Sequence, residues 1–97
     1  MPDLDDLIHQ PARLRIMSAL TSLGPREQVD FSFLKEKLAL SDGNLGAHLR
    51  ALEEASYILV EKTFVERRPK TFVAASAAGR KAFAAHVAAL QSILGRK

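Results

Sequence analysis

Residues 41–55 read Ser-Asp-Gly-Asn-Leu-Gly-Ala-His-Leu-Arg-Ala-Leu-Glu-Glu-Ala, and this stretch decides the fold that we predict for the chain. At about 100° per residue, as in an α-helix, Leu45, Leu49 and Leu52 fall on one narrow stripe. The opposite side has almost no bulk and carries Gly43, Ala47, Arg50 and Glu54. A solvated helix would normally carry Lys, Glu or Gln there, because glycine disfavours a helix by roughly 1 kcal/mol. The bare side therefore favours close approach of this helix to a large surface.

The start of this helix suits a negatively charged ligand. Ser41 is a predicted N-cap, and Asp42 lies in the first turn, where the helix dipole favours an acid. Free N–H groups at a helix N-terminus also bind phosphate. Ser41 and Asn44 can hydrogen-bond phosphates or base edges, and Arg50 is the strong cation of the outward side. We interpret residues 41–55 as a candidate DNA-recognition helix. Taken alone, the stretch is equally consistent with a short amphipathic core helix.

Length and composition bound the function. The 97 residues make one domain, 1–97, which is too small for a large enclosed catalytic cavity. The chain has no cysteine, which excludes disulfides, thiolate metal sites and cysteine nucleophiles. It also lacks a nucleophile–base arrangement and a glycine-rich phosphate loop, so we expect neither an enzyme nor a cofactor or metal ion. With no membrane-spanning run and no secretory signal pattern, we expect a cytoplasmic protein.

Charge is concentrated in one short segment. Lys and Arg number 14 against 11 Asp and Glu, an excess that alone means little. Residues 62–70, however, carry four bases and one acid, whereas residues 1–6 carry three acids and no base. A local positive segment is the pattern expected of a protein that binds a polyanion.

Periodicity predicts a mainly α-helical chain with one β-hairpin. We expect a short helix before Pro11, then helices over 11–23, 31–38, 41–55 and 77–94, with Asp30 and Ser76 as N-caps. Helices 31–38 and 41–55 are joined by a very short turn, as in a helix-turn-helix, within a helical core over 11–55. Val29 is expected to form a brief strand. The period changes to two after residue 55, which predicts a hairpin over 57–75 with strands 57–65 and 71–74.

The predicted hairpin, which we name the wing, has a basic tip. Glu66-Arg67-Arg68-Pro69-Lys70 lies between the two strands, and we place the proline in this turn. Two adjacent arginines at a tip serve no evident folding purpose, so we favour a contact with DNA over a merely solvated tip.

The last helix, within residues 76–94, is apolar on two sides. Phe83, Val87, Leu90 and Leu94 form one stripe, which we expect to pack on the chain's own core. A second stripe runs alongside it, and we expect it to meet a second copy of the chain. The predicted dimer interface comprises Leu4, Leu7, Ile8, Ala82, His86, Ala89 and Ile93. His9 and His86 are expected to pack between helices or at the dimer interface rather than to bind a metal ion, because isolated histidines are poor indicators of a metal site.

The sequence resembles the winged helix-turn-helix regulators of the MarR and ArsR type, in particular the minimal MarR-related group, from about residue 4 to 94. The residues that carry the resemblance are Pro11-Ala12-Arg13-Leu14-Arg15-Ile16, Phe31-Ser32-Phe33-Leu34, Leu40-Ser41-Asp42-Gly43-Asn44-Leu45, His48-Leu49-Arg50-Ala51-Leu52-Glu53-Glu54, Arg68-Pro69-Lys70-Thr71 and Ser76-Ala77-Ala78-Gly79-Arg80. Such proteins usually have glycine after the recognition helix, where this chain has Ser56. The expected fold is α+β, with the order α-α-α-α-β-wing-β-α.

The resemblance implies a homodimer that binds double-stranded DNA in a sequence-specific way as a transcriptional regulator, most simply a repressor. Helix 41–55 would enter the major groove, and the wing would reach a minor groove or flanking phosphates. The candidate DNA contacts are Ser41, Asn44, Ala47, His48, Arg50, Lys62, Arg67, Arg68, Lys70 and Thr71. For His48, packing at the edge of the core is the alternative.

Two further possibilities stay open on the sequence alone. Winged helices also serve as protein–protein modules without specific DNA binding, and fold alone does not decide between these functions. A small-molecule effector is not indicated. The one roomy place we expect for it is a groove between helix 77–94 and the N-terminal helix.

Overall fold

The structure, a computed structural model, describes residues 3–25 and 27–95. Five helices are seen in these residues: α1 (Asp6–His9), α2 (Pro11–Thr21), α3 (Phe31–Leu38), α4 (Asp42–Glu54) and α5 (Ala77–Ile93). Three strands complete the fold: β1 (Val29–Asp30), β2 (Ile58–Val65) and β3 (Arg68–Ala75). The order of elements confirms the predicted α+β fold and the brief strand at Val29.

Short polar side chains start the helices where the sequence predicts. The Asp30 carboxylate accepts a hydrogen bond from the Phe33 N–H at 2.8 Å at the start of α3. The Ser41 hydroxyl accepts one from the Asn44 N–H at 3.1 Å at the start of α4. Ser76 caps α5 in the same way. Each cap satisfies a backbone donor that has no partner within the helix, which fixes where the helix begins.

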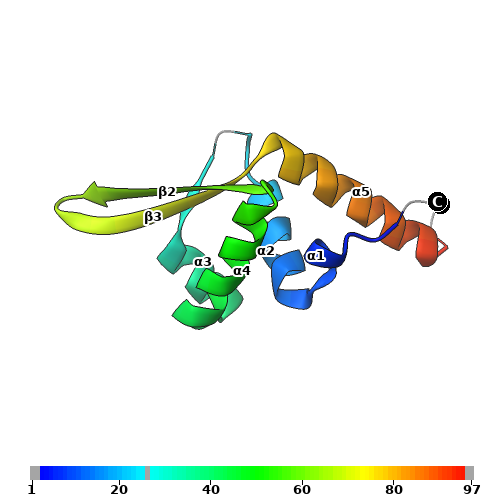
Figure 1. Cartoon of the computed structure of the whole chain (residues 1–97), viewed down its shortest axis with the longest axis horizontal. Helices are drawn as coiled ribbons and strands as arrows, with labels where there is room; N and C mark the ends of the chain where they lie inside the picture. Colours follow the sequence, from blue (N-terminus) through cyan, green and yellow to red (C-terminus); the bar gives the residue numbers. More distant parts are fainter. Residues whose placement is uncertain (1–2, 26, 96–97) are drawn as a thin grey trace.

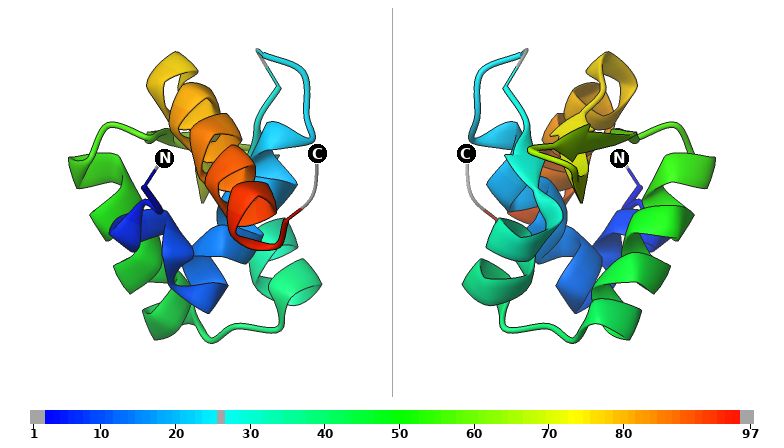
Figure 2. Two further views of the ribbon diagram at one scale, coloured as in Figure 1. Left: turned by 90° about the vertical axis from the view of Figure 1, so that its right-hand side faces the viewer. Right: turned by 90° about the vertical axis from the view of Figure 1, so that its left-hand side faces the viewer.

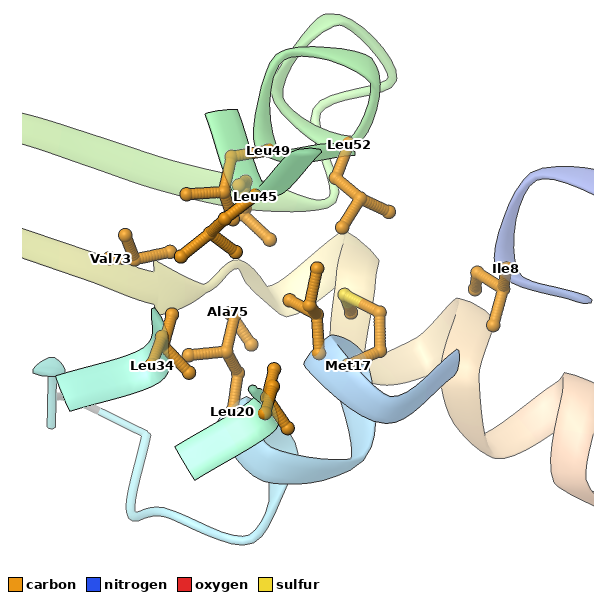
Figure 3. Close-up of a cluster of buried hydrophobic side chains, with 12 residues drawn as sticks. Ile8, Met17, Leu20, Leu34, Leu45, Leu49, Leu52, Val73 and Ala75 are labelled. Carbon is orange, nitrogen blue, oxygen red and sulfur yellow. The ribbon is translucent and has the colours of Figure 1, made fainter. Parts of the chain in front are cut away.

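The stripe of leucines on α4 is the centre of the core. Leu45, Leu49 and Leu52 are buried and point toward β3 and α2, as Figure 3 shows. Buried side chains of α2, including Met17 and Leu20, lie in the same hydrophobic cluster as these leucines. Burial of this many apolar side chains is the main stabilising contribution to a domain of this size. The core thereby fixes which side of α4 faces outward.

The hairpin projects well beyond the core. The three strands pair antiparallel in the order β1-β3-β2, and β1 covers only residues 72 and 73 of β3. The remainder of β2 and β3 reaches away from the helices, and α5 points toward the other end of the molecule (Figure 1). The molecule is consequently elongated, with extents of 51 × 25 × 21 Å.

The turn of the hairpin differs from the prediction. Val65 pairs with Arg68, so the turn contains only Glu66 and Arg67, both with positive φ (51° and 67°). Two central residues with positive φ define a type I′ turn, whose twist matches that of paired strands. Pro69 is therefore not in the turn but in β3, opposite Phe64. The Val65–Arg68 pair closes the turn, and Phe64–Pro69 is the next pair along the two strands. In an antiparallel ladder this next pair is a non-hydrogen-bonded one.

Helix α5 is turned relative to the prediction, so the core meets Phe83 of the stripe expected there and also residues of the second stripe. Gly79, His86 and Ala89 are buried, whereas Val87 and Leu90 are only half-buried. The reason is close approach: a Cβ on Gly79 would lie 1.9 Å from the backbone oxygen of Tyr57. Small side chains let α5 lie against the start of the hairpin, and larger ones would hold it away. Ile93 and Leu94, at 56% and 69% exposure, are open to solvent at its end.

Three residues of the predicted dimer interface lie inside the protomer. Ile8, His86 and Ala89 have at most 1% exposure and are covered by the chain itself, so they offer no surface to a partner. Leu4, Leu7 and Ala82 are half-buried, and Ile93 is exposed. End-on views show α5 crossing over the helical body beside α1 (Figure 2).

A hydrogen-bonded cluster joins α1 to α5. The backbone N–H of Asp5 donates to His86 Nδ1 at 3.0 Å, and His86 Nε2 lies 3.4 Å from His9 Nδ1. The Tyr57 hydroxyl donates to the Asp5 carboxylate at 2.6 Å. These contacts link α1 to α5 in the region where a groove for an effector was expected. His86 is buried between the helices as expected, whereas His9 contacts it but is itself exposed.

The end of α2 is held by an arginine from α5. The helix ends at Thr21, two residues before the predicted end. The Arg80 guanidinium donates to the carbonyl oxygens of Thr21, Leu23 and Gly24 at 2.9–3.2 Å. A cation at a helix C-terminus is favourable, because the last carbonyls carry partial negative charge and have no partner within the helix.

Candidate nucleic-acid interface

The outward side of α4 is as bare as the sequence predicts. Asn44, Ala47 and Arg50 are the side chains on this part of the helix, and the exposed Gly43 adds none. A Cβ added to Gly43 would meet no atom within 4 Å, so nothing in the protomer requires glycine at that position. The open space at Gly43 leaves this turn of the helix accessible to a large external surface.

The N-terminus of α4 is nearly neutral in side-chain charge. Asp42 forms an ion pair with Lys35 of α3, with 2.9 Å between carboxylate oxygen and ammonium nitrogen. Both side chains are well exposed, so the pair adds little stability. It does offset the negative charge of Asp42, which would otherwise repel a phosphate at this end of the helix.

His48 turns inward toward α2. The His48 side chain lies beside Arg13, and its Nδ1 is 3.2 Å from a guanidinium nitrogen of that residue. The same guanidinium donates through Nε to the backbone oxygen of Leu7 at 2.6 Å. Burial, and then the Arg13 charge, lower the pKa of His48 below its ordinary value. His48 therefore lies at the edge of the core, as in the alternative that the sequence left open.

A groove of ≈ 230 Å³ separates α4 from the sheet. Three predicted contact residues meet there, namely Arg50 from α4, Lys62 from β2 and Thr71 from β3. Glu53 lines the same groove, and sequence analysis did not single it out. The Arg50 guanidinium passes over Gly46, where an added Cβ would lie 3.8 Å from its Nη1. The structure thus places three of the predicted residues at one concave surface.

The two faces of the wing differ in chemistry. Side chains alternate along a strand, so Lys62 and Phe64 share the face of β2 that carries the buried Ile58. Pro69 and Thr71 lie opposite them on β3. This face, which we name the inner face of the wing, is the one toward α4. The other side, the outer face, carries Leu59, Glu61, Thr63 and Val65 from β2 and Arg68, Lys70, Phe72 and Ala74 from β3.

The basic side chains of the wing are not equivalent. Arg67, in the turn, and Arg68, which begins β3, are exposed at the tip. Lys70 instead forms an ion pair with Asp30, with 3.2 Å between Nζ and the carboxylate oxygen. The carboxylate that Lys70 contacts also caps α3, and the Phe33 N–H and Lys70 together lower the pKa of Asp30. Lys70 is therefore engaged within the protomer, unlike the arginines.

Sequence reasoning missed one residue of the wing. Phe64 is 72% exposed on the inner face, although large aromatic side chains are usually covered. The signal was present, because the period-two pattern of the strand places Phe64 with Lys62 beyond the end of the core. Its aromatic ring had suggested only a strand-forming residue.

The described part of the chain contains no group of three or more His, Cys, Asp or Glu side chains placed to hold a metal ion. Within the same residues, no helix is long and apolar enough to cross a membrane.

Comparison with known proteins identifies the family. Residues 12–94 match the winged helix DNA-binding domain family. An uncharacterized protein of Methanocaldococcus jannaschii is 38% identical over 77 residues, which cover 79% of this chain and 80% of that protein. Two solved structures are also similar. A transcriptional regulator homologue from Pyrococcus horikoshii OT3 has a TM-score of 0.84 and 28% identity, covering 94% of this chain and 87% of that one. NolR from Sinorhizobium fredii, at 23% identity and a TM-score of 0.64 over 95% and 81% of the chains, shares the fold.

The family match begins within α2 and ends after α5, so it includes the bare helix, the basic wing and the core that joins them. The family is one of DNA-binding domains. The chain belongs to the winged helix DNA-binding domain family.

Proposed function

We propose that the protein is a sequence-specific regulator of transcription that binds double-stranded DNA as a homodimer, most simply as a repressor. The observation that carries the proposal is the bare, exposed side of α4, where the fold does not require glycine at position 43. This side of the helix lies beside a wing with basic side chains. A major groove about 12 Å wide accepts an α-helix, and a helix without bulk can enter deeply.

The side chains of α4 suit distinct parts of a base pair. Arg50 can donate two hydrogen bonds to guanine, and Asn44 can make paired bonds with adenine. Ala47 presents a methyl group that can pack on a thymine methyl. The Ser41 hydroxyl accepts the capping hydrogen bond and still has its own proton to donate to a phosphate. His48 is left out of this set because its ring is engaged with Arg13.

The wing would contact a minor groove or the adjacent backbone. Arg67 and Arg68 are exposed and can reach phosphates, and Lys62 with Thr71 extends the contact toward α4. Lys70 contributes less in this proposal, because a contact with phosphate would compete with its Asp30 ion pair.

The exposed apolar side of α5 supports the homodimer. Ile93 and Leu94 are exposed at the last turn of α5, at the end of the molecule opposite the wing, and the half-buried Leu90 adjoins them. A revised interface would keep Leu4, Leu7 and Ala82 at its margin. Contiguous exposed apolar surface of this kind commonly marks an interface between proteins.

The proposal is tested by selecting bound duplexes from a random pool and measuring affinity for the selected duplex across a salt series. We expect a shared sequence motif and steep weakening with salt, because each phosphate contact releases a counterion. The Arg67→Ala/Arg68→Ala variant should reduce the slope of log affinity against log salt by about 0.9 for each phosphate that it no longer neutralises.

Lys81→Ala is the matched control, since Lys81 is an exposed cation of α5 that lies outside the predicted DNA interface. It should leave the salt slope unchanged. Absence of any enriched motif, together with an affinity insensitive to salt, would contradict the proposal.

One observation favours a second candidate, a protein–protein module. Leu59 and Val65 of the wing are exposed apolar side chains on its outer face, where a partner chain could pack. Such a module would bind duplex DNA without motif preference or with a flat salt response. The selection and salt series above therefore distinguish the two functions.

A further inference from the structure

We infer that Phe64 and Pro69 form an apolar wedge with which the inner face of the wing enters the minor groove and partly unstacks one base step. This inference rests on the proposed function, since it assumes that the wing lies against a duplex. It assigns a DNA contact to an uncharged part of the wing. The roles proposed above for Arg67 and Arg68 do not explain why this part of the wing is apolar.

The two side chains form one continuous apolar surface. Phe64 and Pro69 are direct partners in the β2–β3 register, and both are exposed. Side chains that face each other across an antiparallel pair lie about 4.5–5.5 Å apart at Cβ. At 72% exposure, the Phe64 ring is outside the hydrophobic core and contributes little to folding by burial. The ring is therefore available to an external partner.

The position of the pair directs it toward the same partner as α4. Next along the inner face come Lys62 and Thr71, which line the groove beside Arg50. A duplex contacted by α4 and by that groove would meet Phe64 as it continues along the wing. Leu59, which is comparably exposed at 63%, lies on the outer face and would point away from such a duplex.

The charges around the pair select a nucleic acid over an apolar protein surface. The exposed part of the inner face has one charged side chain, Lys62, and no carboxylate. Arg67 and Arg68 follow at the tip, where Glu66 is the one acid. A minor groove attracts cations into its negative potential, and proteins that bend DNA insert Phe or Pro between base steps there. The outer face also carries Arg68 near the tip and Lys70, which is paired with Asp30, but its exposed Leu59 lies beside Glu61, whose carboxylate would face phosphate unfavourably.

The test compares Phe64→Ala with Leu59→Ala on a selected duplex. One base at a time in the flank contacted by the wing is replaced by 2-aminopurine, whose fluorescence rises on unstacking, and dyes at the duplex ends report bending by energy transfer. Wild-type protein should raise the fluorescence at one step and shorten the end-to-end distance. Phe64→Ala should abolish both signals and weaken binding about tenfold, within the range for removal of an aromatic ring stacked on a base.

The salt slope separates this contact from charge. Phe64→Ala should leave the slope unchanged, because the variant neutralises as many phosphates as wild type, and Leu59→Ala should behave as wild type in every measurement. Both residues are exposed, so both variants should keep the melting temperature of the parent. Phe64→Leu, which keeps an apolar side chain, should retain part of the bend.

Each remaining outcome has one meaning. Salt-dependent, motif-specific binding that Phe64→Ala leaves intact would overturn the wedge and leave the proposed function standing. Weaker binding by Phe64→Ala without any fluorescence or bending signal from wild type would also overturn it, since the ring would then touch only the groove wall. Failure of wild type to bind any duplex in a salt-dependent way would remove the proposed function itself.

Discussion

At the scale of single residues, Ser56 ends the recognition-helix candidate in an unusual way. Its φ is 65°, a left-handed value that favours glycine. The Ser56 N–H donates to Glu53 O and the Tyr57 N–H donates to Leu52 O, both at 2.9 Å, which is the Schellman pattern. Ser56 therefore keeps the C-cap geometry that a glycine would provide. Its left-handed backbone is strained, because the residue has a Cβ.

Ser56→Gly should consequently stabilise the protein. Removing Cβ from a left-handed residue relieves about 1 kcal/mol, and part of this is offset by the greater freedom of glycine in the unfolded chain. We expect the midpoint of urea unfolding to rise with no change in its slope. Ser56→Ala is the control, because it keeps Cβ and the strain. A midpoint for Ser56→Gly at or below that of the alanine variant would contradict this account.

His86 should make stability depend on pH. Burial first, and then the charge of His9, lower the pKa of His86 below its ordinary value of 6.5, while Asp5 opposes the shift. Between the lowered pKa and 6.5 the unfolded chain binds more protons than the folded one, so stability rises with pH and is complete above about 6.5. Protonation would also put a second N–H where Nδ1 now accepts from Asp5.

We therefore expect the free energy of unfolding to fall as pH is lowered from about 7.5 to about 5, measured by urea denaturation at each pH. His86→Gln should flatten this dependence whatever its absolute stability. A residual slope of the same sign should remain from His48, whose pKa is also lowered. An unchanged slope in the His86→Gln variant would exclude His86 as the origin.

At the scale of elements, α4 carries a position, Gly43, at which we expect one substitution to raise the stability of the protein and to weaken DNA binding. Gly43 has open space around it, so Gly43→Ala should stabilise the helix by up to about 1 kcal/mol. If the helix approaches DNA closely there, the same methyl group should weaken DNA binding. Thermal unfolding and duplex affinity together measure this opposition. Gly79→Ala is the contrasting control, since its Cβ would overlap Tyr57 O and should destabilise the fold.

The elements also show how far sequence reasoning reaches. Helices α3 and α4 were predicted closely because each combines a polar cap with a clear leucine stripe. The wing turn was misplaced because Glu66 and Arg67 do not announce a type I′ turn, for which Asn-Gly or Asp-Gly is usual. The core-facing side of α5 was predicted only in part because both stripes are apolar, and the close approach of Gly79 to Tyr57, which brings the second stripe inward, leaves no periodic signal.

The site could be predicted only in part. Exposure of Arg50, Arg67 and Arg68 follows from the pattern of each element alone. The inward turn of His48 depends on Arg13, which is 35 residues away in the chain, and the ion pair of Lys70 depends on Asp30. Such long-range partners leave no periodic signal, so a single sequence does not disclose them.

At the scale of the whole molecule, α5 should determine assembly. Leu94 is 69% exposed, so Leu94→Asp should fold normally yet place a charge within the proposed interface. We expect wild type to be dimeric and this variant monomeric at tens of micromolar, by size exclusion with light scattering. Leu59→Asp, an equally drastic change on the wing, should remain dimeric. A monomeric wild type under these conditions would remove the dimer from the proposed function.

The elongation of the protomer has a consequence for operator architecture. Since α5 and the wing extend toward opposite ends of a 51 Å axis, a pair joined through α5 would carry its two wings at the outer limits of the assembly. The two protomers could then bind the same side of a duplex only when their half-sites are separated by a whole number of helical turns, with about 10 base pairs per turn. Five extra base pairs in the spacer, about half a turn, should rotate one half-site to the far side and cost more affinity than the insertion of about ten.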